Sequence, residues 1–300
     1  MNNQSIEERL LGREALLYLE LADKVATAVD GTKYPCMPTA EYMEVCQSTI
    51  SQANKIYCSE MLGRAHLAAA VSILRHREWL RGMMVSAHKD NFFAFATAFR
   101  GFIESVADSY DVMRSVPATL AENAANIERA VTGKARDGMI LGRELEDTLI
   151  HFAFARKTTP SEAAPASHST KRVRKYLEVL ERADIPHLIE CYSELCDLAH
   201  SGISSVAVFL TEQSPGTLEL QSVPSRRLVS DYCAAYQGMM LPMLMFGFNG
   251  PLVTLALLNW FSLPAFHTSP VTFQMVSTIP VWTKIEAKLR TVREDIGQSA

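Results

Sequence analysis

From Tyr232 to Thr283 the chain contains no Asp, Glu, Lys or Arg, and this charge-free stretch constrains the fold more than any other feature. It includes two strongly apolar segments, 239–248 and 252–261. A membrane-spanning helix needs roughly 20 predominantly apolar residues, whereas breaks divide this run into pieces of about ten. The breaks are Pro242, Gly247, Asn249, Gly250, Pro251 and Asn259. We therefore expect no stable membrane insertion, but buried core helices or an apolar dimer face rich in methionine.

Composition agrees with a soluble protein. The 300-residue chain has 48% hydrophobic and 21% charged residues, enough to bury roughly three quarters of the surface that its unfolded form exposes. Its six cysteines form no Cys-x-x-Cys pair and its first residues lack a secretory signal, so we expect reduced thiols in a cytoplasmic protein. We expect no metal and no cofactor. A net charge of −4 argues against a nucleic-acid footprint over the whole chain, and the basic run 171–175 is most simply a solvated helix face.

Hydrophobic residues recur at helical intervals, which predicts an all-α, multi-helix bundle. Helices are expected over 5–29, 40–87, 91–113, 115–133, 137–154, 171–183, 187–200 and 282–296. Gly63 is a weak point within 40–87, and Asp90 is the expected N-cap of the helix 91–113. Residues 206–211 and 217–223 have strand character around a Ser-Pro-Gly turn, which predicts one small peripheral β-hairpin at about 206–223. A mobile loop, 156–170, separates an N-terminal helical half, 1–155, from a C-terminal half, 171–300. We expect the halves to pack as one compact unit.

Five polar residues form the candidate site: Arg100, Glu104, Tyr192, Asp197 and His200. Helical projection places His200 at the border of a buried face, where we expect it to serve a site without being exposed. Arginine and histidine in a shared cleft could stabilise a phosphodiester, with the imidazole as acid or base. Arg100, Glu104 and His200 are therefore candidate catalytic residues, and Tyr192 and Asp197 candidate binding residues. The structural alternative is a surface ion pair and a histidine that completes a helix terminus.

Other fingerprints are missing or weak. The sequence has no Gly-rich phosphate loop, His-Glu-x-x-His or Gly-x-Ser-x-Gly pattern. Cys196 and His200 have the spacing of a helical metal pair, with Cys191 a little earlier, but a packed cysteine beside a capping histidine explains them without zinc.

The motifs Arg100-Gly-Phe-Ile-Glu104 and Tyr192-x-x-Leu195-x-x-x-x-His200 resemble HEPN-like helical proteins, most closely an uncharacterised bacterial branch with such helices. The resemblance spans residues 60 to 225 and implies a helical bundle that homodimerises. In active members of the family it also implies metal-independent RNA cleavage in stress or antiviral systems. The nuclease signature, arginine followed by histidine after four to six residues, is not intact before His200, where Ser193, Glu194 and Leu195 stand. Arg182 and His187 have the spacing, but Pro186 interrupts it.

Three hypotheses follow. The first is a non-catalytic HEPN-like module, homodimeric and cytoplasmic, that binds RNA, a nucleotide or a protein in a bacterial stress or defence context. The second is a divergent metal-independent RNase that uses Arg100 and His200. The third is a membrane-associated protein that uses residues 239–266.

Overall fold

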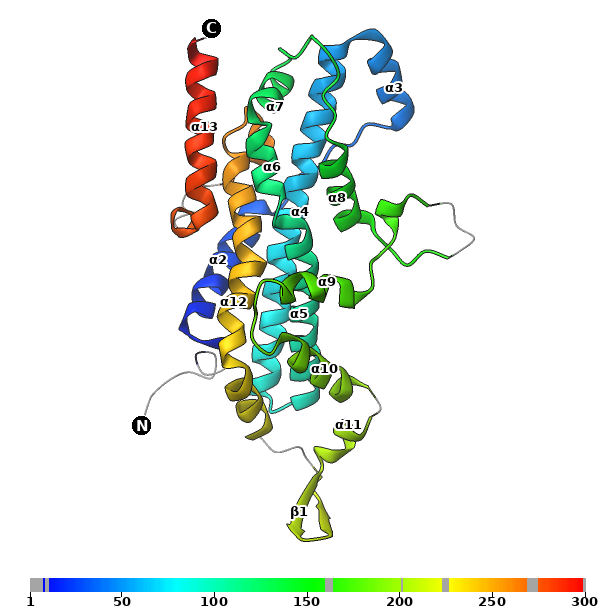
Figure 1. The fold of residues 1–300 in the computed structure, drawn as a ribbon, viewed down its shortest axis with the longest axis vertical. Coiled ribbons are helices and arrows are strands. Elements are labelled where there is room, and N and C mark those ends of the chain that lie inside the picture. The colour runs from blue at the N-terminus through cyan, green and yellow to red at the C-terminus, as the bar shows by residue number, and fades with distance from the viewer. Residues whose placement is uncertain are drawn as a thin grey trace. The chain divides into compact units, whose positions relative to one another are not determined.

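The structure, a computed structural model, describes residue 8 and residues 11–159, 164–200, 202–222, 227–268 and 275–298. Helices dominate this part of the chain, and β1 (Leu210–Ser214) pairs with β2 (Thr217–Leu220) in an antiparallel hairpin (Figure 1). Every residue of both strands is exposed. The predicted all-α class with one small peripheral hairpin is therefore confirmed. Residues 5–7, 9 and 10 of the first predicted helix, 160–163 of the predicted loop and residue 223 of the predicted hairpin lie outside the described residues.

Helix boundaries follow the predicted pattern with several differences. The α-helices are α2 (Arg13–Val29), α3 (Thr39–Ser48), α4 (Ile50–His88), α5 (Phe92–Met113), α6 (Val116–Glu122), α7 (Ala124–Val131), α8 (Arg143–Phe154), α9 (Val173–Glu181), α10 (Leu188–Ala199), α11 (Ile203–Ala207), α12 (Arg227–Leu258) and α13 (Pro280–Gln298). Short 3₁₀ turns are η1 (Ala166–His168), η2 (Pro264–Phe266) and η4 (Val276–Thr278). The strand predicted to begin at residue 206 begins at Leu210, because α11 occupies the preceding residues.

Two predicted helix signals were wrong in position. The break expected at Gly63 lies at Thr49, and α4 runs unbroken through the glycine. The ring of Phe266 covers Gly63 so closely that a Cβ there would lie 2.9 Å from Phe266 Cζ. Gly63 therefore serves close packing rather than a bend. The N-cap of α5 is Asn91, whose Oδ1 accepts the N–H of Ala94 at 3.1 Å, and Asp90 takes a left-handed turn with φ of 54°.

The charge-free stretch does not divide into short pieces, because α12 continues through Pro242 and Pro251. Glycines let this helix pack closely, which offsets the cost of an interior proline. A Cβ on Gly247 would lie 2.9 Å from Val106, and one on Gly250 would lie 2.9 Å from the carbonyl oxygen of Met113.

Length and composition would also let α12 cross a membrane, and it is the one such helix in the described part of the chain. Its most apolar window is 61% buried inside the protein. A core helix explains this burial directly. The absence of stable membrane insertion stays a prediction, which flotation with liposomes would test.

The described residues form two compact units, and each unit draws on both predicted halves of the chain. Unit 1 comprises residues 1–23, 74–108 and 173–247, and unit 2 comprises residues 24–73, 109–172 and 248–300. How the predicted halves combine stays a prediction.

In unit 1, Tyr232 of α12 joins three helices. Its ring centroid lies 6.2 Å from that of Phe92 and 6.3 Å from that of Phe99, both on α5. Its hydroxyl donates to the carbonyl oxygen of Cys191 on α10 at 3.3 Å. These contacts hold α10 against α5, and in Figure 1 α10 leads through α11 into the hairpin.

In unit 2, Asn54 of α4 fixes the segment before α8. Its buried amide donates to the carbonyl oxygens of Ala135 and Gly138, at 3.2 and 2.8 Å, and accepts the N–H of Ile140 at 2.8 Å. After α8, the predicted mobile loop is tied where it is described, because Arg156 forms a β-bridge with Ser169. These contacts place α8 beside the first half of α4.

Candidate functional site

The candidate site begins with an ion pair on α5. Arg100 and Glu104 lie one helical turn apart, and Arg100 Nε donates to Glu104 Oε1 at 2.9 Å. The side chains are 27% and 31% exposed, so water screens the pair only in part. The buried phenylalanines of α5, including Phe95, Phe99 and Phe102, anchor the helix and hold this pair in place.

Tyr192 of α10 reaches the same carboxylate. Its hydroxyl donates to Glu104 Oε1 at 2.7 Å, and its ring centroid lies 6.0 Å from Arg100 Cζ. One carboxylate oxygen thus accepts from two side chains on different helices. The shared acceptor fixes the guanidinium and the phenol relative to each other.

His200 completes the group. Arg100 Nη1 lies 3.5 Å from His200 Nε2, which confirms the expected proximity of these two residues. His200 is the C-cap of α10, with φ of −108° and ψ of 166°, and its backbone N–H donates to the carbonyl oxygen of Cys196. The expectation that His200 would be covered was wrong: it is exposed, because the chain leaves the helix at this residue.

Burial and charge set the protonation states of this site. Burial by itself lowers the pKa of Arg100, but the hydrogen bond and the negative charge of Glu104 outweigh it and raise that pKa. Burial raises the pKa of Tyr192, and its bond to the Glu104 carboxylate raises it further. At neutral pH Arg100 is therefore charged and Tyr192 is a protonated donor.

Asp197 lies away from this group. It is exposed, and in the described residues no hydrogen bond or ion pair joins its side chain to the other four predicted site residues. Five residues after Tyr192 on a helix, it points about 140° away around the axis. Its role as a binding residue stays a prediction.

Cys196 is a neighbour that sequence reasoning did not assign to the site. It is half-buried, one turn after Tyr192, and its thiol adds a smaller contribution that raises the pKa of Tyr192. Its i,i+4 spacing from both Tyr192 and His200 was the available signal. No group of three or more metal-ligating side chains suitable for a metal ion occurs in the part of the chain that the structure describes.

The arrangement presents a guanidinium and an exposed imidazole side by side, with a carboxylate and a phenol behind the guanidinium. Such a pair can donate hydrogen bonds to the oxygens of a phosphate. No family model matches the chain, and comparisons with curated proteins and with solved structures gave no match. The resemblance to HEPN-like proteins therefore depends on the sequence motifs alone.

Proposed function

We propose that this protein is a non-catalytic, HEPN-like helical module that binds the phosphate of RNA or of a nucleotide at Arg100 and His200. The supporting observation is the 3.5 Å approach of Arg100 Nη1 to His200 Nε2 at an exposed position. Arginine is well suited to phosphate because its planar guanidinium offers several donors in fixed geometry. In this proposal the protein works as a cytoplasmic homodimer in a bacterial stress or defence system, as the motifs imply.

Binding fits the geometry better than catalysis. Glu104 Oε1 already accepts from Arg100 and Tyr192, so Glu104 is placed to orient Arg100 rather than to act as a base. His200 is the only imidazole among the predicted site residues. Acid–base cleavage of a phosphodiester needs one group to take a proton and another to donate one.

Binding can be measured by fluorescence anisotropy with a labelled single-stranded RNA, with unlabelled RNA and ATP as competitors. Loss of charge-assisted hydrogen bonds should weaken binding about tenfold or more in Arg100→Ala, and less in His200→Ala. Competition by ATP as well as by RNA would indicate a nucleotide ligand, and competition by RNA alone would indicate RNA.

Arg227→Ala is the matched control. Arg227 also lies in unit 1 and pairs with a carboxylate four residues away, Asp231, but its side chain is 83% exposed. Arg100→Ala and Arg227→Ala each remove one positive charge, so a non-specific charge effect would weaken RNA binding equally in these two variants. Wild-type affinity in both Arg100→Ala and His200→Ala would contradict the proposal.

A divergent RNase is the second candidate, favoured by the exposure of the His200 imidazole beside a guanidinium. Incubation of the full chain with RNA in the presence of EDTA tests metal-independent cleavage. Cleavage by the wild type that disappears in His200→Ala would support it. Intact RNA with the wild type would exclude it and leave the binding proposal standing.

A further inference from the structure

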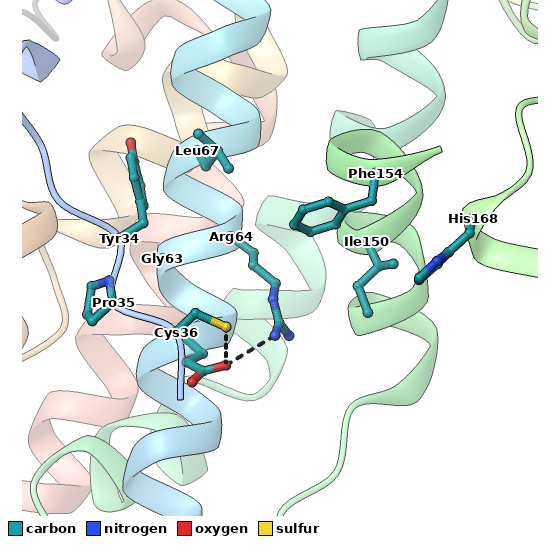
Figure 2. Close-up of a pocket in the computed structure, with 10 residues that line it drawn as sticks. Tyr34, Pro35, Cys36, Gly63, Arg64, Leu67, Ile150, Phe154 and His168 are labelled. Carbon is teal, nitrogen blue, oxygen red and sulfur yellow. Dashed lines mark hydrogen bonds and ion pairs between the residues drawn. The ribbon is translucent and has the colours of Figure 1, made fainter. Parts of the chain in front are cut away.

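Unit 2 contains a cavity of about 360 Å³ that lies outside the proposed phosphate site (Figure 2). The connector before α3 forms one wall, α4 forms the floor, and α8 with His168 forms the other side. Small-molecule sites in proteins typically measure about 300–1,000 Å³. The cavity is therefore large enough for a small ligand.

Most of the cavity wall is apolar and preformed. Leu67 and Ile150 contribute aliphatic surface, and Phe154 contributes a ring that is 57% exposed. Tyr34 is fixed from behind, because its hydroxyl lies 2.8 Å from His66 Nδ1 and its ring stacks on Phe266 with centroids 5.8 Å apart. A bound aromatic or branched aliphatic group would cover the Phe154 ring, which removes apolar surface from water.

Glu60 and Arg64 line the polar end of the cavity and belong to a group of three charged side chains with excess negative charge, whose third member, Glu146, does not line the cavity. Arg64 pairs with two carboxylates, Glu60 and Glu146, each at 3.1 Å. The side chains of Arg64, Glu60 and Glu146 are 23%, 18% and 29% exposed, so the charges are only partly screened. One guanidinium against two carboxylates leaves a formal charge of one negative unit. An anionic ligand is therefore repelled, and a cationic ligand is attracted.

Glu60 is the carboxylate placed to receive such a ligand. It accepts the backbone N–H of Met37 at 2.7 Å and one Arg64 N–H, and it lies 4.0 Å from the thiol of Cys36. A carboxylate has about four acceptor positions, so these partners leave capacity for a further donor. Glu60 also lines a second cavity of about 440 Å³ beside the same connector, together with Glu41 and Lys55.

We infer that this cavity binds a small organic amine. Its ammonium group donates to Glu60, and its aromatic or branched aliphatic body packs on Phe154 and Leu67. This inference is independent of the phosphate site, because all the residues that carry it belong to unit 2.

Three probes of similar size test the charge argument with the full chain. They are 2-phenylethylamine, 2-phenylethanol and 3-phenylpropionate, which are cationic, neutral and anionic at neutral pH. Isothermal titration calorimetry should show the amine binding at least about tenfold more tightly than either of the others, a ratio that one charge-assisted hydrogen bond supplies. Equal or tighter binding of the anion, or no binding of any probe, would overturn the inference.

Substitutions at the cavity and alkylation of the Cys36 thiol test whether the amine binds at this location. Glu60→Gln keeps an acceptor but removes the charge, so the preference for the amine over the alcohol should disappear. Glu181→Gln, a substitution of the exposed last residue of α9, should keep that preference. The amine should also slow alkylation of the exposed Cys36, read by peptide mass spectrometry. If Glu60→Gln does not fold, Phe154→Ala replaces it and should weaken binding of the amine. An unchanged Cys36 rate at saturating amine, or an unchanged preference in Glu60→Gln, would count against this location.

Discussion

Two regions of the molecule contain a similar local motif, an arginine and a glutamate four residues apart on one helix, but differ in net charge. In unit 1, Arg100 pairs with Glu104 on its own helix, and another helix adds Tyr192 and the exposed His200. In unit 2, Arg64 pairs with Glu60 on its own helix, and α8 adds a second carboxylate, Glu146. In both regions a tyrosine hydroxyl donates to a carboxylate of the group, Tyr192 to Glu104 and Tyr57 to Glu146.

The difference lies in what the second helix contributes. With one carboxylate and one imidazole around it, Arg100 belongs to a group that is neutral, or positive when His200 is protonated, which suits a phosphate. With two carboxylates around it, Arg64 belongs to a group with excess negative charge, which suits an amine. An arginine–glutamate pair four residues apart therefore does not define a ligand, because the tertiary partner sets the sign of the charge.

The largest expected effect is a loss of stability in acid that depends on His66 in unit 2 and not on His200 in unit 1. Burial lowers the pKa of His66, in unit 2, from 6.5 to about 4. As the pH falls, His66 is therefore protonated in the unfolded chain before it is protonated in the folded chain. The free energy of unfolding that depends on neutral His66 is fully present above pH 6.5 and is lost as the pH falls towards 4. The loss should be on the order of 3 kcal/mol. Denaturant unfolding between neutral and acidic pH should show it. The loss should shrink in His66→Gln and persist in His200→Ala; an equal acid loss in wild type and His66→Gln would contradict the assignment.

The next effect compares the two arginines. Arg64→Ala leaves two partly buried carboxylates without their cation, so it should lower the free energy of unfolding by about 2 kcal/mol. Arg100→Ala leaves only one, so about 1 kcal/mol is expected. Chemical denaturation of both variants measures the difference, with Arg227→Ala as the exposed control. A larger loss of unfolding free energy in Arg100→Ala than in Arg64→Ala would contradict this prediction.

The smallest effect compares the two tyrosine hydroxyls. The Tyr57 hydroxyl donates to Glu146 at 3.2 Å and accepts the N–H of Gly142 at 2.9 Å, so Tyr57→Phe leaves two groups without this partner. Tyr192→Phe removes its donation to Glu104. We expect losses of about 1.5 kcal/mol for Tyr57→Phe and about 1 kcal/mol for Tyr192→Phe. Thermal unfolding can rank them, and equal losses would show that the Gly142 contact adds nothing.

Much of the fold could be predicted because helical periodicity and turn residues are local properties. The hairpin was readable from its Ser-Pro-Gly turn, and α5 from the spacing of its phenylalanines. Gly63 was misread, because glycine in a sequence indicates either a break or close packing, and only the position of Phe266 decides between them. The prolines of α12 were misread for a similar reason, since tertiary packing offset their local cost.

The candidate site divides in the same way. The sequence by itself determined that Arg100 and Glu104 lie one turn apart and that His200 ends a helix, because both follow from the geometry of a helix. Helix geometry also separates Asp197 from Tyr192 by about 140°. Only the tertiary structure decided that Tyr192 and His200 meet the Arg100–Glu104 pair, and that Glu146 gives Arg64 a second carboxylate. Helical spacing fixes neighbours within a turn, whereas contacts between residues far apart in the chain depend on how the helices pack.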